Sequence, residues 1–456
     1  MEKLKKLLKV VAFVLVFVLL LNVVSTALVA PNDYRCYQWV GQFYENEKDS
    51  LDAVYLGSSA AYAYWCPTLA WEDYGITVWN YTTPRQPLLA AKYLIEDCRK
   101  TQKDALYIVN LNRTAMSYDK TAIHYLLDYM PFSVNKLKLT KALCDFADIQ
   151  GEDTLQYYFP LELYHTRWNA LTAKDFEYKS NKMMSSPNYT GFITGIYNNT
   201  EEEIIVTDQT SQPEQKYIDV LDDLLDYCDE KDVNILFTIS SQLFDSDSRQ
   251  LKMNYAKQYV TERGYKVLDF CQEYPSTNLD ITQDFYNTEH ANIHGAIKLT
   301  DYLGKYLVEN YDFENKRGKE GYEAWDESID VYKSAISSSV LPFEYETENR
   351  DYSLKSVEYT DSSYDGKSIH VSWEASEGAQ GYKVYRKTLN NDNKKQSSYS
   401  ELMTLTADQT SFTDADFDAK NDGTYSFTYV VVPFKTVSGV TKYGSFRYAG
   451  TTVRVE

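Results

Sequence analysis

Two short segments of the chain carry residues that could perform nucleophilic chemistry together. Gly57-Ser58-Ser59 directly follows a short apolar run, and His290 lies within a polar segment from 284 to 296. A serine hydroxyl is a weak nucleophile until a neighbouring base removes its proton, and histidine is well suited to this task near neutral pH. Ser59 and His290 therefore predict attack on an ester or thioester carbonyl, provided that the fold brings them together.

The pattern of apolar and amphipathic segments predicts how the chain positions these two residues. From about residue 50 to residue 311 the alternation is typical of a parallel sheet covered by helices. The expected strands are 52–56, 77–79, 105–109, 233–239 and 265–270, and the expected helices are 87–100, 217–228, 247–263 and 295–311. Ligands of open parallel sheets gather where the strands end. Because Ser59 ends the first strand and His290 precedes the last helix, both are expected at that edge.

The same two segments resemble the motifs of a known family. Val-Tyr-Leu-Gly-Ser-Ser at 54–59, and Asn-Thr-Glu-His at 287–290 leading into Ala-Asn-Ile-His-Gly-Ala, are similar to motifs of the SGNH hydrolase superfamily. The likeness covers about residues 50–311 and comes closest to the membrane-anchored branch that includes the D-alanyl-teichoic acid synthesis protein and polysaccharide O-acyl-modifying enzymes. It implies an α/β fold with a flavodoxin-like doubly wound parallel sheet. It also implies Ser59 as nucleophile, His290 as base and an acyl-serine intermediate, with no metal and no organic cofactor.

One position departs from the family pattern. Asn287 stands three residues before His290, where the family usually has aspartate. A carboxylate there holds the imidazole tautomer and stabilises the imidazolium, and its replacement by asparagine in a serine protease costs about 10⁴ in rate. We expect Asn287 to orient the ring through its amide oxygen, with Asp284 as the alternative orienting group.

An oxyanion hole needs hydrogen-bond donors preset where negative charge develops. The resemblance implies the backbone N–H of the nucleophile, a glycine N–H after the second strand and an asparagine side chain after the third. Segment 80–86 has no glycine, so the backbone N–H of Thr82 is expected to substitute. After the third strand, Asn110 and Asn112 are both candidates, and Asn112 is slightly favoured.

Residues 113 to about 212 interrupt the alternation in a stretch too long for an ordinary loop. We predict a folded insertion that caps the sheet, within an α/β domain spanning 32–311. His165 and Arg167 in this insertion are candidates for binding an acidic group of a substrate, although aromatic packing of the cap explains the segment as well. The other histidines are interpreted as structural or incidental, namely His294, His124 and His370.

Residues 1–31 are expected to anchor the protein in a membrane. Four lysines precede an apolar run from 10 to 30, in which only Asn22, Ser25 and Thr26 are polar. At ~1.5 Å per residue this run measures ~30 Å, the thickness of the hydrocarbon core. The basic flank predicts a cytoplasmic N-terminus and an extracytoplasmic bulk. The alternative is a cleaved signal peptide and a secreted protein.

The cysteines predict no specific pairing. Six are scattered along the chain without a CxxC pair, so an exported protein could oxidise some of them, whereas zinc binding is not expected. Cys98 and Cys228 fall on the apolar side of helical patterns and are interpreted as core residues.

The last hundred residues change to an all-β pattern. The expected strands are 369–374, 381–387, 401–405, 425–434 and 448–455. Trp373, Tyr382, Tyr385, Phe412 and the strand from 425 to 430 together resemble a fibronectin type III domain, over residues 350–456. The resemblance implies a β-sandwich that serves as a spacer or binding module. The charged segment 312–349 is expected to form a helix and a linker.

Charge and compartment narrow the function further. The chain has 46 Lys and Arg against 66 Asp and Glu, a net charge of −20, which has the wrong sign for binding a nucleic acid. Together with the predicted anchor and compartment, the family resemblance implies a membrane-anchored esterase or O-acyltransferase acting on cell-envelope polysaccharide or teichoic acid, with an acyl-donating membrane protein as a candidate partner. The alternative is a catalytically degenerate scaffold or glycan-binding protein, which Asn287 favours. A third is an adhesin acting through the fibronectin-like domain.

Overall fold

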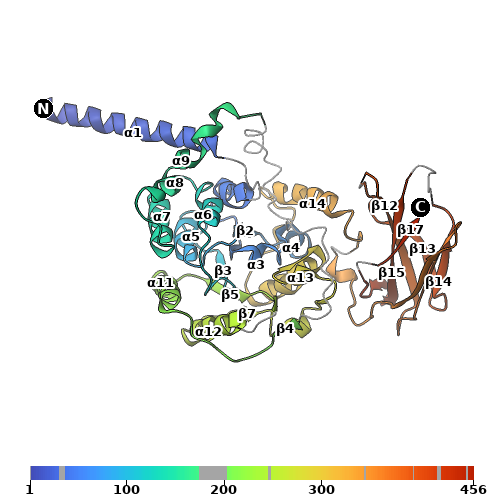
Figure 1. The fold of residues 1–456 in the computed structure, drawn as a ribbon. Helices are drawn as coiled ribbons and strands as arrows, with labels where there is room; N and C mark the ends of the chain where they lie inside the picture. Colours follow the sequence, from blue (N-terminus) through green and yellow to red (C-terminus); the bar gives the residue numbers. More distant parts are fainter. Residues whose placement is uncertain are drawn as a thin grey trace.

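The protein combines a parallel α/β domain with separate antiparallel sheets (Figure 1). The computed structural model describes residues 2–29, 36–173, 203–244, 248–343, 346–393, 395–417, 423–447 and 450–455. Its central sheet is entirely parallel and has the order β2-β1-β3-β5-β7. The five strands are β1 (Ala53–Gly57), β2 (Val78–Thr82), β3 (Leu106–Asn110), β5 (Ile235–Ile239) and β7 (Val267–Asp269). All five strands predicted from the sequence are present, within a few residues at their ends.

Helices cover both faces of this sheet. On one face lie three helices, of which α11 contacts the other two: α5 (Ala90–Cys98), α11 (Gln215–Lys231) and α12 (Ser248–Glu262). The other group comprises α4 (Pro67–Tyr74), α13 (Ile293–Asn310) and α14 (Glu323–Ile336) (Figure 1). The strands read as continuous apolar runs because both of their faces are buried. The direction in which the strands are added reverses between β1 and β3, and this is where open sheets bind ligands.

The described part of the insertion lies beside the sheet, in contrast to the prediction of a cap over it. Its elements are α6 (Lys120–Leu127), α7 (Val134–Phe146), η3 (Gly151–Thr154), α8 (Leu155–Tyr158), α9 (Leu161–Tyr164), η4 (His165–Asn169) and β4 (Glu203–Ile204). α7 packs on α5, and Phe146 contacts Tyr217 of α11 at 5.5 Å between ring centroids. These helices therefore extend the layer of α5 and α11 towards the N-terminal helix. The rest of the predicted cap, 174–202, lies outside the described residues.

The N-terminal helix α1 (Glu2–Leu28) projects from the α/β domain (Figure 1). Over Glu2–Ser25 it is long and apolar enough to cross a membrane, and the 18-residue apolar window of this segment is not buried by the rest of the chain. An N-terminal signal sequence would pass the same test of length and composition. After it, η1 (Tyr37–Gly41) and η2 (Gln42–Glu45) pack on β2, where Trp79 Nε1 donates to the carbonyl of Trp39 at 2.8 Å.

The six cysteines are all buried as free thiols. Burial raises the pKa of Cys228 to about 12, so this thiol stays protonated at neutral pH. Cys98 and Cys228 are core residues, in agreement with the interpretation from the sequence.

The C-terminal region forms two antiparallel sheets that share one apolar core. One sheet contains β10 (Tyr359–Tyr364), β11 (Ile369–Trp373) and β14 (Ser411–Asp414), and the other contains β12 (Gly381–Asn390), β13 (Ser400–Thr406), β15 (Tyr425–Val437), β16 (Val440–Tyr443) and β17 (Thr451–Val455). Trp373 packs against Tyr382 across the two sheets at 5.4 Å. The pattern had predicted five of these strands, whereas β10, β14 and β16 carry many polar residues and were not predicted.

Candidate active site

Ser59 follows β1 on a tight turn into the short helix α3 (Ser59–Tyr62). Ser58 is the N-cap of α3, and its side chain accepts a hydrogen bond from the N–H of Ala60. Gly57 allows β1 to approach its neighbours closely, because a Cβ atom at this position would lie 2.8 Å from Cβ of Asn110 and 3.0 Å from Cβ of Ala61. The glycine thus permits the close packing that presents Ser59 beyond the end of β1.

A small hairpin positions the other two residues. It consists of β8 (Phe285–Asn287) and β9 (His290–Ala291), joined by a two-residue turn, and Asn287 pairs directly with His290. The spacing of three residues therefore has a structural cause, since it makes the two residues opposite each other in the hairpin. The Tyr64 hydroxyl stabilises the turn, because its hydrogen is shared between the carbonyls of Ser241 and Glu289.

The structure brings Ser59, His290 and Asn287 into one hydrogen-bonded series. His290 Nε2 lies 2.7 Å from Ser59 Oγ, although the two residues are 231 positions apart in the chain. His290 Nδ1 lies 2.8 Å from Asn287 Oδ1. A nucleophile, a base and an orienting group at these distances form the arrangement that activates serine in acyl transfer.

Hydrogen bonding to Asn287 determines the tautomer of His290. The backbone N–H of Glu289 donates to Asn287 Oδ1 at 2.9 Å, and an N–H donor requires an oxygen at that position. Nδ1 of His290 must then carry a hydrogen and donate it to the same oxygen. In neutral imidazole the other nitrogen, Nε2, is the acceptor. The ring is therefore ready to receive the proton of Ser59.

Burial keeps His290 neutral. Desolvation lowers the pKa of this imidazole to about 4, and the adjacent Glu289 carboxylate opposes only part of the effect. Asn287 supplies no negative charge that would raise the pKa. His290 is consequently an available but weak base at neutral pH.

Asp284 has a different role from the alternative considered in the sequence analysis. Its Oδ2 accepts hydrogen bonds from Lys298 Nζ at 2.8 Å and from the Asp280 N–H at 2.6 Å. The Asp284 and Lys298 side chains form a nearly fully buried ion pair. Asp284 thus joins the hairpin to α13, and Asn287 takes the orienting position beside His290.

The predicted oxyanion donors are only partly available. Thr83 N–H donates to the Gly57 carbonyl, so the alternating N–H of Thr82 is directed to the other side of β2, away from β1. This corrects the prediction for the Thr82 N–H. The buried Thr82 hydroxyl has no hydrogen-bond partner within the described ranges. Ser59 is the first residue of α3, so its own N–H has no intrahelical acceptor and can bind an oxyanion.

The side chain of Asn112 connects the ends of β3 and β5 by hydrogen bonds, so its amide is not free to bind an oxyanion at Ser59. Its Oδ1 accepts from the Ser240 N–H at 2.8 Å, and its Nδ2 donates to the Ser240 carbonyl at 3.0 Å. Asn110, the other candidate, donates to the Ser240 hydroxyl at 3.0 Å. Ser240 in turn donates to the carbonyl of Ala60, next to Ser59. Through Ser240, both asparagines therefore stabilise the turn that carries Ser59.

Replacing Asn112 with alanine should destabilise the fold. The substitution leaves the buried N–H and carbonyl of Ser240 without partners, which we expect to cost about 2–4 kcal/mol of the free energy of unfolding. Urea unfolding measures this, with the exposed Asn310→Ala as the matched control. An unchanged unfolding curve combined with a large loss of turnover would instead assign Asn112 to the oxyanion hole.

Comparison with known proteins identifies no family for this chain. No family model matches it, and no curated protein matches it. A pectate lyase from Erwinia chrysanthemi, solved with tetragalacturonic acid, is 18% identical over 22% of this chain and 27% of its own, with a TM-score of 0.14. A gut microbial diltiazem-metabolizing enzyme is 9% identical over 78% of this chain and 70% of its own, with a TM-score of 0.20. Similarity at this level supports no argument about fold or activity.

Three arginines that the sequence analysis did not single out lie near the hydrogen-bonded series. Arg85 follows β2, Arg113 follows β3, and Arg249 begins α12 after β5. Arg249 pairs with Glu289, the neighbour of His290, and Arg85 pairs with Asp119. For Arg85 and Arg113, a basic residue three positions after the end of a parallel strand is the signal that could have found them.

Arg113 has the least complete hydrogen bonding of the three arginines. Its Nε is buried with no hydrogen-bond partner in the ranges that the structure describes. Burial lowers the pKa of Arg113, Glu289 opposes this, and Arg85 and Arg249 lower the pKa further. A neighbouring cavity of about 250 Å³ is bordered by Asn112, Arg249 and Lys252. Arg113 and Arg249 thus act on Glu289, the residue directly before His290.

His165 and Arg167 lie elsewhere, which corrects their assignment to a substrate pocket. Both belong to η4, where Arg167 donates to the carbonyl of Leu28 at the end of α1 and His165 bonds to the Glu162 carbonyl. The remaining histidines have structural surroundings. His294 is buried in α13, His124 bonds to Asp128 in α6, and His370 bonds to Thr413 and Asp365 in the C-terminal sheets.

Proposed function

We propose that this protein is a membrane-anchored, extracytoplasmic serine esterase or O-acyltransferase of SGNH type, acting on acyl groups of a cell-envelope polysaccharide or teichoic acid. The observation that carries the proposal is the hydrogen-bonded series Ser59–His290–Asn287. The strand order β2-β1-β3-β5-β7 corresponds to the flavodoxin-like order and supports the assignment. The shared core of the C-terminal sheets supports a fibronectin type III domain acting as spacer or binding module.

In the proposed reaction, Ser59 Oγ attacks the acyl carbon while its proton moves to His290 Nε2. The negative charge that develops on the carbonyl oxygen is stabilised by the N–H of Ser59. The bond to the leaving alkoxide then breaks, and His290 returns the proton to that oxygen. Water or a glycan hydroxyl next attacks the acyl-serine and gives its proton to His290, which passes it to Ser59 Oγ. The protein thereby returns to its starting state.

The arginines favour an anionic substrate over a neutral one. Arg249 pairs with Glu289 and Arg85 pairs with Asp119, whereas Arg113 Nε has no hydrogen-bond partner among the described residues. Guanidinium groups bind phosphate and carboxylate through paired hydrogen bonds. The free Nε of Arg113 is available for such a bond. A phosphate-bearing teichoic acid or an acidic polysaccharide fits this charge.

Arg113→Gln tests the charge of the substrate. Lipoteichoic acid is expected to inhibit hydrolysis of 4-nitrophenyl acetate by the wild type, and the variant should weaken this inhibition by about tenfold or more, since a hydrogen bond to a charged group contributes about 1.5–3 kcal/mol. The kcat/KM for neutral 4-nitrophenyl acetate should stay within about twofold, because this ester presents no anion to Arg113. Arg263→Gln removes the same charge from a surface cluster with Asp226 and Asp229 and serves as control. Equal inhibition of all three proteins would exclude an anion site at Arg113.

Two further features complete the proposal. The lysines before the apolar part of α1 favour a cytoplasmic N-terminus and an extracytoplasmic bulk. A transferase would need an acyl donor, and an acyl-carrying membrane protein beside α1 is the candidate partner.

The second candidate function is a catalytically degenerate scaffold or glycan-binding protein. The neutral Asn287 favours it, because an amide cannot offset the positive charge that His290 gains during the reaction. A fluorophosphonate probe separates the two functions, since the probe reacts only with an activated serine.

Mass spectrometry of the probe-treated full-length protein is the decisive experiment. The enzyme proposal expects one adduct, on Ser59, that disappears in Ser59→Ala and His290→Ala and persists in the control variants Ser334→Ala and His370→Ala. Absence of any adduct from the folded wild-type protein would favour the scaffold.

A further inference from the structure

Large apolar side chains are exposed in an unusual concentration beside the end of α1. Outside α1, the exposed large apolar residues in the described ranges are six between 132 and 168 and four elsewhere. The six, called the apolar rim below, are Phe132, Val134, Leu155, Phe159, Leu163 and Trp168. The other four are scattered, namely Val206, Tyr286, Val437 and Val440. Large apolar side chains exposed together on one segment of the chain are typical of an interaction site.

Two of the segments that carry the rim are attached to α1. α9 and η4 both contact α1, as the view of the whole fold also shows (Figure 1). Tyr164 of α9 packs with Leu28 and Val29, and Arg167 Nη1 donates to the Leu28 carbonyl at 2.8 Å. Tyr164 also donates to Asp128 Oδ2 at 2.7 Å, which ties α9 to α6. The position of α1 therefore sets the position of the rim.

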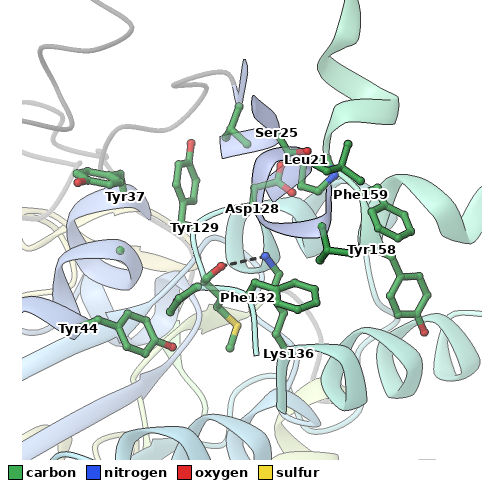
Figure 2. A pocket seen from close by; sticks show the side chains of 16 residues that line it. Leu21, Ser25, Tyr37, Tyr44, Asp128, Tyr129, Phe132, Lys136, Tyr158 and Phe159 are labelled. Carbon is green, nitrogen blue, oxygen red and sulfur yellow. Dashed lines mark hydrogen bonds between the residues drawn. The ribbon is translucent and has the colours of Figure 1, made fainter. Parts of the chain in front are cut away.

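A cavity of about 320 Å³ lies between α1 and these segments (Figure 2). Val18 and Leu21 of α1, and Val29 directly after it, line the cavity together with Phe132 and Phe159 of the rim. Polar groups that line it, those of Lys136, Asp128 and Tyr44, have hydrogen-bond partners. Lys136 Nζ, for example, donates to the Met130 carbonyl at 2.9 Å, as the dashed line in Figure 2 marks.

The length of α1 sets the depth of the rim in a bilayer. Val18 and Val29 are 11 residues apart, which at ~1.5 Å per residue is ~16 Å, about half of the ~30 Å hydrocarbon core. The apolar run ends near residue 30, so this half of α1 lies in the outer leaflet if the run spans the membrane. Phe132 and Phe159 face the same cavity and so lie beside this half of α1, at the depth of the outer leaflet or of its surface.

We propose that the apolar rim is inserted among the lipids of the outer leaflet, so that segment 132–168 is a monotopic membrane-binding surface next to α1. The occupant of the surface is the phospholipid layer itself. Trp168 and the phenylalanines suit the boundary between headgroups and acyl chains. The inference rests on α1 remaining as a membrane span, which is part of the proposed function, but it requires no catalytic activity.

Spin labels on the full-length protein in phospholipid nanodiscs test the depth. Single cysteines replace Phe132, Phe159, Leu163 and Trp168 in turn, and the six native thiols are buried and should not react. Val440→Cys is the matched control, because Val440 and Phe132 are both 48% exposed. Leu15→Cys, in the centre of α1, is the control for insertion of the anchor.

The expected result is a difference in collision rates with two relaxing agents. Labels at the rim and at Leu15 should collide at least about threefold more often with oxygen, which concentrates in lipid, than with a water-soluble nickel chelate, whereas the label at Val440 should show the opposite ratio. Rim labels as open to the chelate as Val440 would overturn the proposal, as would a water-exposed label at Leu15. A surface reserved for a partner protein gives the first of these outcomes, because the nanodisc holds this chain alone. Since no turnover is measured, an inactive enzyme would leave the result unchanged.

Discussion

Alanine at either Ser59 or His290 is expected to lower kcat/KM for a reactive ester by about 10⁴-fold or more, because each substitution removes a group without which the acyl-serine cannot form. The 2.7 Å contact between Ser59 Oγ and His290 Nε2 makes the two residues one functional unit. Steady-state turnover of 4-nitrophenyl acetate by the full-length protein measures the loss.

The double variant gives a second, sharper result. Residues that act as a unit lose activity together, so Ser59→Ala combined with His290→Ala should be no slower than the worse single variant. Additive losses would mean that the two side chains contribute separately, and the proposed mechanism would then be wrong. His370→Ala, which changes a histidine of the C-terminal sheets, should leave turnover unchanged.

The meeting of Ser59 and His290 could be predicted because each position follows from local pattern. Apolar runs determine where parallel strands end, and the first of them ends just before Gly57-Ser58-Ser59. The spacing of Asn287 and His290 matches the opposite positions of a hairpin with a two-residue turn. Strand order therefore predicted that Ser59 and His290 lie at one edge of the sheet, and the resemblance to SGNH motifs supplied the roles of nucleophile, base and orienting residue.

The partners of the supporting residues could not be predicted in the same way. Asn112 binds the backbone of Ser240, 128 residues later. Every residue has the same backbone groups, so the sequence does not indicate which of them a side chain will bind. The interaction of Arg113 with Glu289 likewise depends on loops that follow different strands. The direction of the Thr82 N–H depends on which alternate amide pairs with β1, and a shift of one residue reverses it.

The elements against which the insertion packs could not be predicted either, for a related reason. Its length shows that it folds, but an amphipathic helix can pack against any apolar neighbour. The structure packs α7 on α5 and carries α9 to α1, so His165 and Arg167 lie away from Ser59. The apolar rim could be recognised only from the exposed fractions of its side chains, which the sequence pattern does not give.

Asn287→Asp is expected to increase activity, which is unusual for a substitution beside a catalytic base. The wild-type amide already selects the productive tautomer, because Asn287 Oδ1 accepts hydrogens from both the Glu289 N–H and His290 Nδ1. What it lacks is the charge that stabilises the imidazolium. The known loss of about 10⁴ for the reverse change in a serine protease includes the wrong tautomer, so we expect a smaller gain here, about 10- to 10³-fold in kcat at pH 8.

The pH profile distinguishes this electrostatic role from a change in folding. His290 must be neutral to accept a proton, and burial lowers its pKa to about 4, so wild-type kcat/KM should persist at pH 5 and fall only as the pH drops through about 4. A carboxylate at 287 favours the protonated ring and should raise that pKa by about 1–3 units, moving the acid limb upward by the same amount. Asn310→Asp, the same change on the exposed end of α13, should move neither kcat nor the limb. If Asn287→Asp left the limb near pH 4, the residue at 287 would not be facing Nδ1 during turnover. If instead it moved the limb without raising kcat, stabilisation of the imidazolium would not limit the rate, and the neutral Asn287 would cost the protein nothing in catalysis.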